Sequence, residues 1–425
     1  MEIDIGRGKK GRRAYGLDEI AIVPSRRTRD PEDVDLSWRL DGHAFDIPLL
    51  ASAMDGVVDT RSAGIIGKLG GLGVLNLEGI QTRYEEADAE LERIAGMPPD
   101  EATRGLQEIY REPVKPELIA HRIKEIKDQG VVAAGSLTPQ RVTDYVDVAL
   151  EAGLDILVIQ GTVVSAEHVS SVTEPLNLKR FISELPVPVI VGGCASYHTA
   201  LHLMRTGAVG VLVGVGPGAA CTTRQVIGVG VPQATAIADA AGARMQHLLE
   251  TGQYVNVIAD GGMAYAGDLA KAIACGADAC MIGSPLAKAQ EAPGRGFHWG
   301  MATFHPQLPR GTRVKTSTIG SLEEAWASPS RLRYQRGQEK AKSRPSSVAG
   351  SRSRAASAAA TASPRSRPFA SDRSSPATAV AVQMAARCPA ASARPDQSIA
   401  IARPGRPAPT PCRPTAPAGA SCPRS

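Results

Sequence analysis

Short apolar runs recur along the first 284 residues, and segments with a helical pattern separate them. Each run is at most eight residues long and nearly unbroken in hydrophobicity, which is typical of strands covered on both faces. The runs span residues 47–54, 71–76, 131–136, 155–161, 187–193, 210–216, 255–261 and 279–284. Amphipathic stretches such as 138–153, 195–207 and 233–252 lie between runs and close with glycine, a common helix stop.

Eight strand–helix units predict an α/β fold, a (β/α)8 TIM barrel, over residues 1–325. An open doubly wound sheet is the alternative. Residues 78–129 are longer than one crossover helix, are charged and contain Pro98-Pro99. We expect two or three surface helices there, without a core of their own.

Polar and glycine residues gather where the apolar runs end. In a barrel, this is the end of the strands that carries the chemistry. The residues are Ser52, Met54 and Asp55, Asn76, Gln160, Gly192 and Gly193, then Asp260, Gly261 and Gly262, and finally Gly283 and Ser284. The last two groups follow the seventh and eighth runs, where such barrels often bind phosphate.

A glycine-rich loop, Gly214-Val-Gly-Pro-Gly-Ala-Ala-Cys221-Thr-Thr-Arg224, follows the sixth run. Glycine lets backbone N–H and C=O groups approach a ligand closely. A partly exposed cysteine among such dipoles is a candidate nucleophile. The alternative is a mobile loop with an incidental cysteine.

Charge divides the chain. Its net charge is +5, but residues 326–425 hold 17 Lys and Arg against 3 Asp and Glu, so residues 1–325 are mildly acidic. The tail is rich in Arg, Ser, Pro and Ala, which predicts disorder. It is either a basic segment that binds polyanions or, as we favour, the product of a shifted reading frame.

The acidic body indicates no nucleic-acid binding, and no apolar run is long enough to span a membrane. The basic cluster at residues 7–13 has no apolar stretch after it, so it is not a secretory signal. The chain has seven cysteines, and those of the body lack metal-ligand spacing. A reducing cytoplasm with free thiols is the simplest interpretation.

The body resembles the IMP dehydrogenase / GMP reductase family over about residues 11–322. The stretches that carry the resemblance are 15–24 (YGLDEIAIVP), 48–55 (PLLASAMD), 69–75 (LGGLGVL), the glycine–cysteine loop, 258–262 (IADGG) and 281–284 (MIGS). The resemblance implies a purine nucleotide across the barrel mouth, with NAD as hydride acceptor. It also implies a homotetramer.

The resemblance assigns catalytic roles. Cys221 attacks carbon 2 of the hypoxanthine ring, hydride passes to NAD, and water releases xanthosine monophosphate from the covalent thioimidate. Thr223 positions the water or relays a proton. Splitting one hard step into two in this way is typical of covalent catalysis.

The resemblance also assigns binding roles. Gly262, Gly283 and Ser284, helped by Ser52, hold the phosphate; Asp260, next to Gly261, accepts the ribose hydroxyls; and Met54 packs on the base. Gln160, Gly161, Gly214 and Gly216 belong to the cofactor side. Backbone carbonyls of Gly216, Gly218 and Cys221 form a site for a monovalent cation, K⁺. A role for Asp260 as a helix N-cap is the alternative for that residue.

The chain departs from the family's pattern in several places. The regulatory domain of paired cystathionine-β-synthase-type modules is missing between the second and third runs. Leu157 replaces a cofactor-contacting Asp, Ala219 replaces a phosphate-binding Ser, and Thr316 stands for a phosphate-contacting Tyr. The flap with its Arg-Tyr base pair is not recognisable. GMP reductase, and a purine-nucleotide-binding relative without catalysis, are therefore kept as alternatives.

Overall fold

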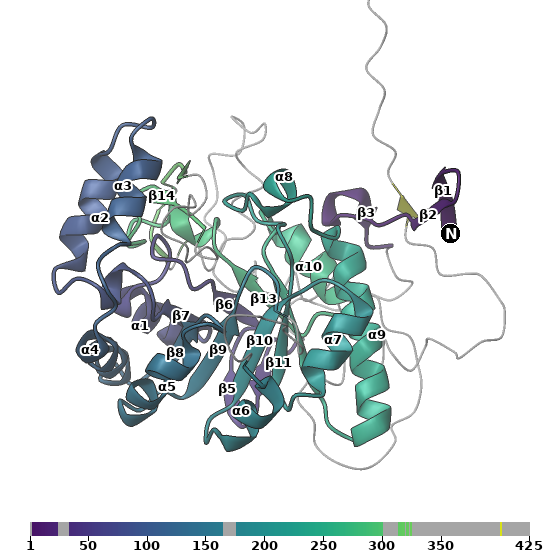
Figure 1. Cartoon of the computed structure of the whole chain (residues 1–425), viewed down its shortest axis with the longest axis horizontal. Coiled ribbons are helices and arrows are strands. Elements are labelled where there is room, and N and C mark those ends of the chain that lie inside the picture. Colours follow the sequence, from purple (N-terminus) through teal and green to yellow (C-terminus); the bar gives the residue numbers. More distant parts are fainter. Residues whose placement is uncertain are drawn as a thin grey trace, which may run out of the picture.

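The computed structural model describes residues 2–23, 34–164, 176–300, 313–318, 320–322, 324 and 400–401. Eight parallel strands close into a barrel (Figure 1). They are β6 (Leu49–Ala51), β7 (Leu72–Asn76), β8 (Ala134–Leu137), β9 (Ile156–Gln160), β10 (Val189–Cys194), β11 (Gly210–Val213), β12 (Asn256–Asp260) and β13 (Ala279–Ile282). The barrel closes where β13 pairs with β6 and Met281 lies opposite Leu50. The predicted TIM barrel is confirmed, and each predicted run overlaps one barrel strand; β8 and β10 each extend one residue beyond the run.

Helices connect successive strands on the outside of the barrel. They are α1 (Thr60–Lys68), α4 (Pro116–Lys127), α5 (Val142–Glu151), α6 (Leu178–Glu184), α7 (Tyr197–Met204), α9 (Gln233–Thr251) and α10 (Ala266–Ala274). Local chemistry sets their ends. Asp59 caps α1 by accepting from the Ser62 N–H at 2.6 Å. Gly252, with φ at 72°, ends α9 in the left-handed conformation that favours glycine.

A hairpin of β4 (Trp38–Leu40) and β5 (His43–Phe45) extends the barrel's inner core. Trp38, Leu40 and Phe45 are buried with inward-facing strand residues such as Leu50 and Leu212. The Trp38 indole donates to the Asn256 side chain at 3.0 Å, at the first residue of β12. The hairpin therefore packs at the amino end of the strands, opposite the end where chemistry is expected.

The segment 78–129 has a core of its own, so that expectation was wrong. It folds into η3 (Ile80–Thr82), α2 (Ala87–Gly96), α3 (Ala102–Ile109) and α4. The core consists of Ile80, Ala87, Leu91, Ile94, Leu106, Ile109, Tyr110 and Trp299. Leu91 and Ile94, and likewise Leu106 and Ile109, are spaced to share one helix face. Trp299 completes this core from about 190 residues further along the chain.

Smaller elements complete the described chain. The strand pairs are β1 (Glu2–Gly6) with β2 (Lys9–Arg12), β3 (Ile20–Ala21) with β16 (Ala400–Ile401), and β14 (Phe297–His298) with β15 (Val314–Lys315). The short helices are η1 (Leu17–Glu19), α8 (Thr223–Val226) and η4 (Leu286–Lys288). The prediction of disorder for residues 326–425 falls outside the described residues, apart from β16. No helix of the described segments has the length and apolar character that a membrane crossing needs.

Candidate active site

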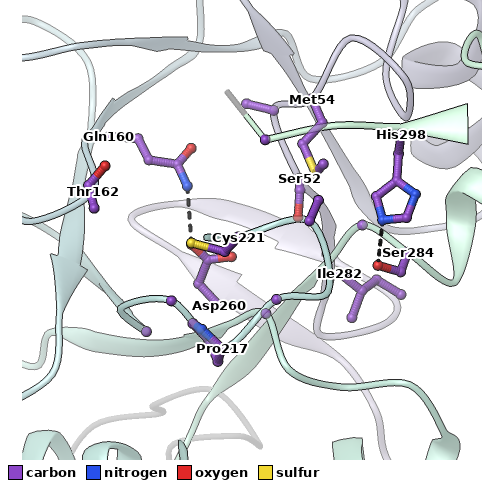
Figure 2. A pocket seen from close by; sticks show the side chains of 18 of the residues that line it. Ser52, Met54, Gln160, Thr162, Pro217, Cys221, Asp260, Ile282, Ser284 and His298 are labelled. Atoms are coloured by element: carbon purple, nitrogen blue, oxygen red, sulfur yellow. Dashed lines mark hydrogen bonds between the residues drawn. The ribbon is translucent and has the colours of Figure 1, made fainter. Parts of the chain in front are cut away.

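A cavity of about 190 Å³ opens at the carboxyl ends of the barrel strands. Figure 2 shows side chains from a part of its wall. The predicted residues that line this cavity are Ser52, Met54, Gln160, Gly161, Gly214, Gly216, Gly218, Cys221, Asp260, Gly261, Gly262, Gly283 and Ser284. Of the residues to which the resemblance assigns a role, only Thr223 is not in the cavity wall; Asp55, Gly192 and Gly193, which also end apolar runs, are not part of the wall either. Thr223 lies directly behind Cys221.

Cys221 lies at the end of a tight turn. Its N–H donates to the Gly218 carbonyl at 3.0 Å, and its Sγ lies 3.1 Å from Thr223 Oγ1. The side chain is half-buried and faces the cavity. Burial raises the pKa of Cys194 and Cys280 to about 12 and that of Cys275 to about 11. Among the described cysteines, Cys221 alone lines this cavity, which fits a nucleophile.

Arg224 holds the glycine loop through hydrogen bonds to two backbone carbonyls. Its Nε donates to the Val215 carbonyl at 3.0 Å, and its Nη2 donates to the Val231 carbonyl at 2.5 Å. A Cβ at Gly216 would lie 2.8 Å from the Arg224 Cγ. Glycine at this position therefore allows the loop to wrap closely around the arginine side chain.

Asp260 is the last residue of β12, and its carboxyl group has a raised pKa. Burial raises its pKa to about 6, while a hydrogen bond from Gln160 Nε2 to Asp260 Oδ2, at 3.1 Å, opposes this rise (Figure 2). The next helix, α10, has Tyr265 as its N-cap, so the helix-cap alternative for Asp260 is wrong. A buried carboxyl group that faces a cavity is a candidate ligand-binding group.

Ser284 is joined to a residue that the sequence analysis missed. Its Oγ lies 2.9 Å from His298 Nε2 (Figure 2). His298 is 1% exposed, and burial lowers its pKa to about 4, so the imidazole is neutral at pH 7. Its Nδ1 has no hydrogen-bond partner among the described residues. The one sequence signal was its place in Phe297-His298-Trp299, soon after the last barrel strand.

Thr316, which stands for the family's phosphate-contacting tyrosine, contacts the backbone of η4. Its hydroxyl donates to the Ala287 carbonyl at 3.3 Å, and the residue is not part of the cavity wall. His298 occupies the cavity wall near Ser284 instead. Gly283, the neighbour of Ser284, is tightly packed, because an added Cβ would lie 2.9 Å from Met54 Sδ.

The wall across the cavity from Ser284 and His298 has polar groups that a further ligand could contact. Ser136, Thr138 and Thr162 line it, and the buried Thr138 hydroxyl has no hydrogen-bond partner among the described residues. An orphaned buried hydroxyl of this kind fits a polar ligand such as a nicotinamide carboxamide. Gly214 is explained by close approach, since an added Cβ would lie 2.1 Å from the Asp260 carbonyl oxygen.

The donor set proposed for a monovalent cation consists of backbone carbonyls in the glycine loop. Oxygen ligands of this kind suit K⁺. The Gly218 carbonyl already accepts the Cys221 N–H, and Gly216 has φ at 71°. These groups fit a cation in their chemistry.

The fold and the cavity define a TIM-barrel protein with a thiol, a buried carboxyl group and a serine–histidine pair at the mouth of the barrel. The family model described as the IMP dehydrogenase / GMP reductase domain matches residues 14–361. The chain belongs to this family, and the resemblance stated from its motifs is confirmed.

Individual relatives are similar over most of the chain. An uncharacterized oxidoreductase of Mycobacterium tuberculosis (strain H37Rv) is 51% identical over 320 residues, which cover 74% of this chain and 85% of the relative. An inosine-5'-monophosphate dehydrogenase of Cryptosporidium parvum is 31% identical over 288 residues, which cover 65% of this chain and 69% of the relative. The crystal structure of an IMP dehydrogenase/GMP reductase-like protein from Corynebacterium glutamicum matches this fold with a TM-score of 0.74. The two chains are 41% identical in sequence, and the match covers 85% of this chain and 93% of that protein.

Proposed function

We propose that this protein is an oxidoreductase that transfers hydride between carbon 2 of a purine nucleoside 5'-monophosphate and a nicotinamide cofactor. The observation that carries the proposal is the shared cavity: the Cys221 thiol, the Asp260 carboxyl group and the Ser284–His298 pair all line it. A nucleophile, a group for hydroxyls and a group for a phosphate are what a covalently bound nucleotide needs.

In this proposal the phosphate lies between Ser284, Gly283, Gly262 and Ser52. The neutral His298 ring, protonated on Nε2, donates to the Ser284 oxygen and leaves the serine hydroxyl free to donate to the phosphate. Asp260 accepts from the ribose hydroxyls as a carboxylate, and Met54 packs against the base. Each group donates or accepts where the nucleotide has the matching atom.

The direction we propose is that of IMP dehydrogenase. The Cys221 thiolate bonds to carbon 2 of IMP, and a hydride leaves that carbon. Water then attacks the thioimidate, which breaks the carbon–sulfur bond and yields xanthosine monophosphate and the free thiol; the thiol loses its proton when it returns to the thiolate. Thr223 holds the water, since its hydroxyl is 3.1 Å from the sulfur. NAD, when bound on the Thr138 side, accepts the hydride. K⁺ at the loop carbonyls and a homotetramer belong to the same proposal.

GMP reductase is the second candidate, and one observation favours it. The hydrogen-bond partner of the Cys221 sulfur is a hydroxyl, Thr223, which is a poor general base. IMP oxidation needs an activated water, and general-base help contributes typically about 10²–10⁴-fold. GMP reduction instead consumes NADPH and two protons and releases ammonium, so its mechanism has no such water.

Two parallel assays test the proposal. The protein is incubated with IMP and NAD, and separately with GMP and NADPH, while the reduced cofactor is followed by absorbance. NADH formation supports the dehydrogenase, and NADPH loss with ammonium release supports the reductase. Purine nucleotide binding without either reaction, and without labelling of Cys221, would show that the protein is a non-catalytic relative.

A further inference from the structure

We infer that the helical insert, defined here as residues 80–110, positions one end of the cavity. This phosphate end is the wall at Ser284 and His298, and Tyr110 is the positioning residue. The inference rests on the proposed function for the nature of the ligand. It concerns a part of the chain to which neither the motifs nor the proposed chemistry assigns a role.

Tyr110 joins two segments that are far apart in sequence. Its hydroxyl donates to the Asp55 carboxylate, and the Trp299 indole N–H donates to the tyrosine oxygen at 2.9 Å. All three side chains are buried. The Asp55 carboxylate also accepts from the Ile80 N–H at 3.0 Å, within the insert itself. We call Asp55, Tyr110 and Trp299 the insert triad.

Two members of the triad come directly after a residue of the cavity wall in the sequence. Asp55 follows Met54, and Trp299 follows His298. Neighbouring side chains of an extended chain point to opposite faces. His298 therefore faces the cavity while Trp299 fills the insert core, and the triad lies directly behind the phosphate end.

A second attachment holds the same segment. Arg313 donates to the carbonyls of Ile94 and Met97 at the end of α2, the latter at 2.7 Å, and its guanidinium lies 4.3 Å from the Phe297 ring centroid. Arg313 is next to β15, which pairs with β14. Figure 1 shows β14 beside α2 and α3. The strand that carries His298 is thus attached to the insert at two points, through Trp299 and through Arg313.

The triad does not contact the cavity, so its effect on ligand binding passes through its neighbours. Without the Tyr110 hydroxyl, the Trp299 indole loses its acceptor and the Asp55 carboxylate loses a donor. The His298 ring, one residue away, is then held less firmly against Ser284. Loss of placement weakens nucleotide binding, whereas the sulfur chemistry at the other side of the cavity is untouched.

The experiment measures nucleotide binding to the full chain by calorimetry, with IMP and GMP as ligands. The variants are Tyr110→Phe, His298→Ala and the double variant. We expect Tyr110→Phe to weaken binding by about 3- to 10-fold, the size of one buried hydrogen bond. In the His298→Ala background, the same change should cost less than about twofold, because neighbours in one network are not additive.

Tyr84→Phe is the matched control. Tyr84 packs against the insert core, and its hydroxyl donates at 2.9 Å to the Ile109 carbonyl, which is a backbone acceptor and not one of the three triad side chains. We expect this variant to lower the melting temperature about as much as Tyr110→Phe and to leave nucleotide affinity unchanged. Trp299→Phe removes the indole donor while keeping a ring, and should weaken binding as Tyr110→Phe does.

The outcomes separate the inference from the proposed function. If the unaltered protein binds neither IMP nor GMP, the proposed function fails. If it binds them, but Tyr110→Phe and Trp299→Phe bind equally well, the inference alone is overturned. An equal loss from Tyr110→Phe with and without His298 would also overturn it, since the effect would not pass through the histidine.

Discussion

At the scale of single residues, burial decides which groups are ready for chemistry. Cys194 and Cys280 are both 1% exposed, whereas Cys221 faces the cavity. The same cavity wall holds a neutral histidine and a carboxyl group with a raised pKa. Each of these three groups supports a measurement on the protein in solution.

Alkylation at about pH 8 should select Cys221 among the four cysteines in the described chain. Burial holds the pKa values of the other three at about 11 or 12, so they remain thiols. Iodoacetamide followed by peptide mass mapping measures this, and bound IMP should protect the site. Equal labelling of Cys194 or Cys280 would contradict the assignment.

Asp260 should make nucleotide affinity dependent on pH. Its pKa is about 6 in the free protein, and the carboxylate is the form that accepts ribose hydroxyls. Affinity should therefore fall as pH drops below about 6, by up to about tenfold per pH unit. The raised pKa of Asp260 also affects the stability of the fold. Above about pH 6 the buried carboxylate lowers the free energy of unfolding, and this loss disappears as pH falls toward about 4.

Calorimetry between about pH 5 and pH 8 tests this, with Asp260→Asn as the reference. The nucleotide phosphate also titrates near pH 6, so the variant keeps the phosphate's contribution and loses that of Asp260. The expected result is a shallower pH dependence in the variant. Parallel curves for the two proteins would rule out Asp260 as the titrating group.

At the scale of elements, the hydrophobic pattern predicts strands better than it predicts contacts. All eight runs overlap barrel strands, because a strand buried on both faces needs an unbroken apolar run. The insert core was missed although seven of its eight buried residues lie within residues 80–110; Trp299 alone of these eight reaches it from far along the chain, which no local pattern marks. His298 was missed for the same reason, since no local pattern marks a histidine that meets Ser284 only in the folded barrel.

Helix α9 should depend on a buried ion pair near the amino ends of the last strands. Arg244 Nη1 lies 2.6 Å from Asp278 Oδ2, both side chains are at most 2% exposed, and Asp278 also accepts from the Val257 N–H. Removing one partner leaves the other charge buried, so Arg244→Ala should lower the free energy of unfolding by about 3–5 kcal/mol.

Arg205→Ala is the control for this measurement. Arg205 pairs with Glu250 at 2.8 Å, but both side chains are partly exposed, so the loss in the free energy of unfolding should be much smaller than for Arg244→Ala. Urea denaturation of both variants gives the comparison. A similar small loss for Arg244→Ala would show that the buried pair does not anchor α9.

At the scale of the whole molecule, the barrel is self-contained within the described chain. Its three buried clusters draw on residues between Leu17 and Leu322. Motifs in the sequence predicted both this barrel and about half of its cavity wall, since glycine and polar residues follow each strand directly. They did not predict which polar groups would pair across the mouth, such as Gln160 with Asp260.

Deleting residues 326–425 should leave the barrel intact. The barrel strands lie between Leu49 and Ile282, and among the described elements the deletion removes β16, the partner of β3, so the melting temperature should change by no more than about 2 °C. Calorimetry of the shortened chain measures this, with nucleotide binding as a second readout. Loss of a polyanion affinity on deletion would show that the basic tail is a nucleic-acid-binding segment.

The most direct test of the central claim follows one hydrogen atom. IMP carrying deuterium at carbon 2 is incubated with NAD, or deuterated NADPH with GMP, and the products are analysed by mass spectrometry. The account predicts that deuterium crosses between carbon 2 and the nicotinamide in one of the two reactions, and that Cys221→Ala stops the transfer while still binding nucleotide. Transfer that persists in Cys221→Ala, or no transfer in either reaction, would contradict it.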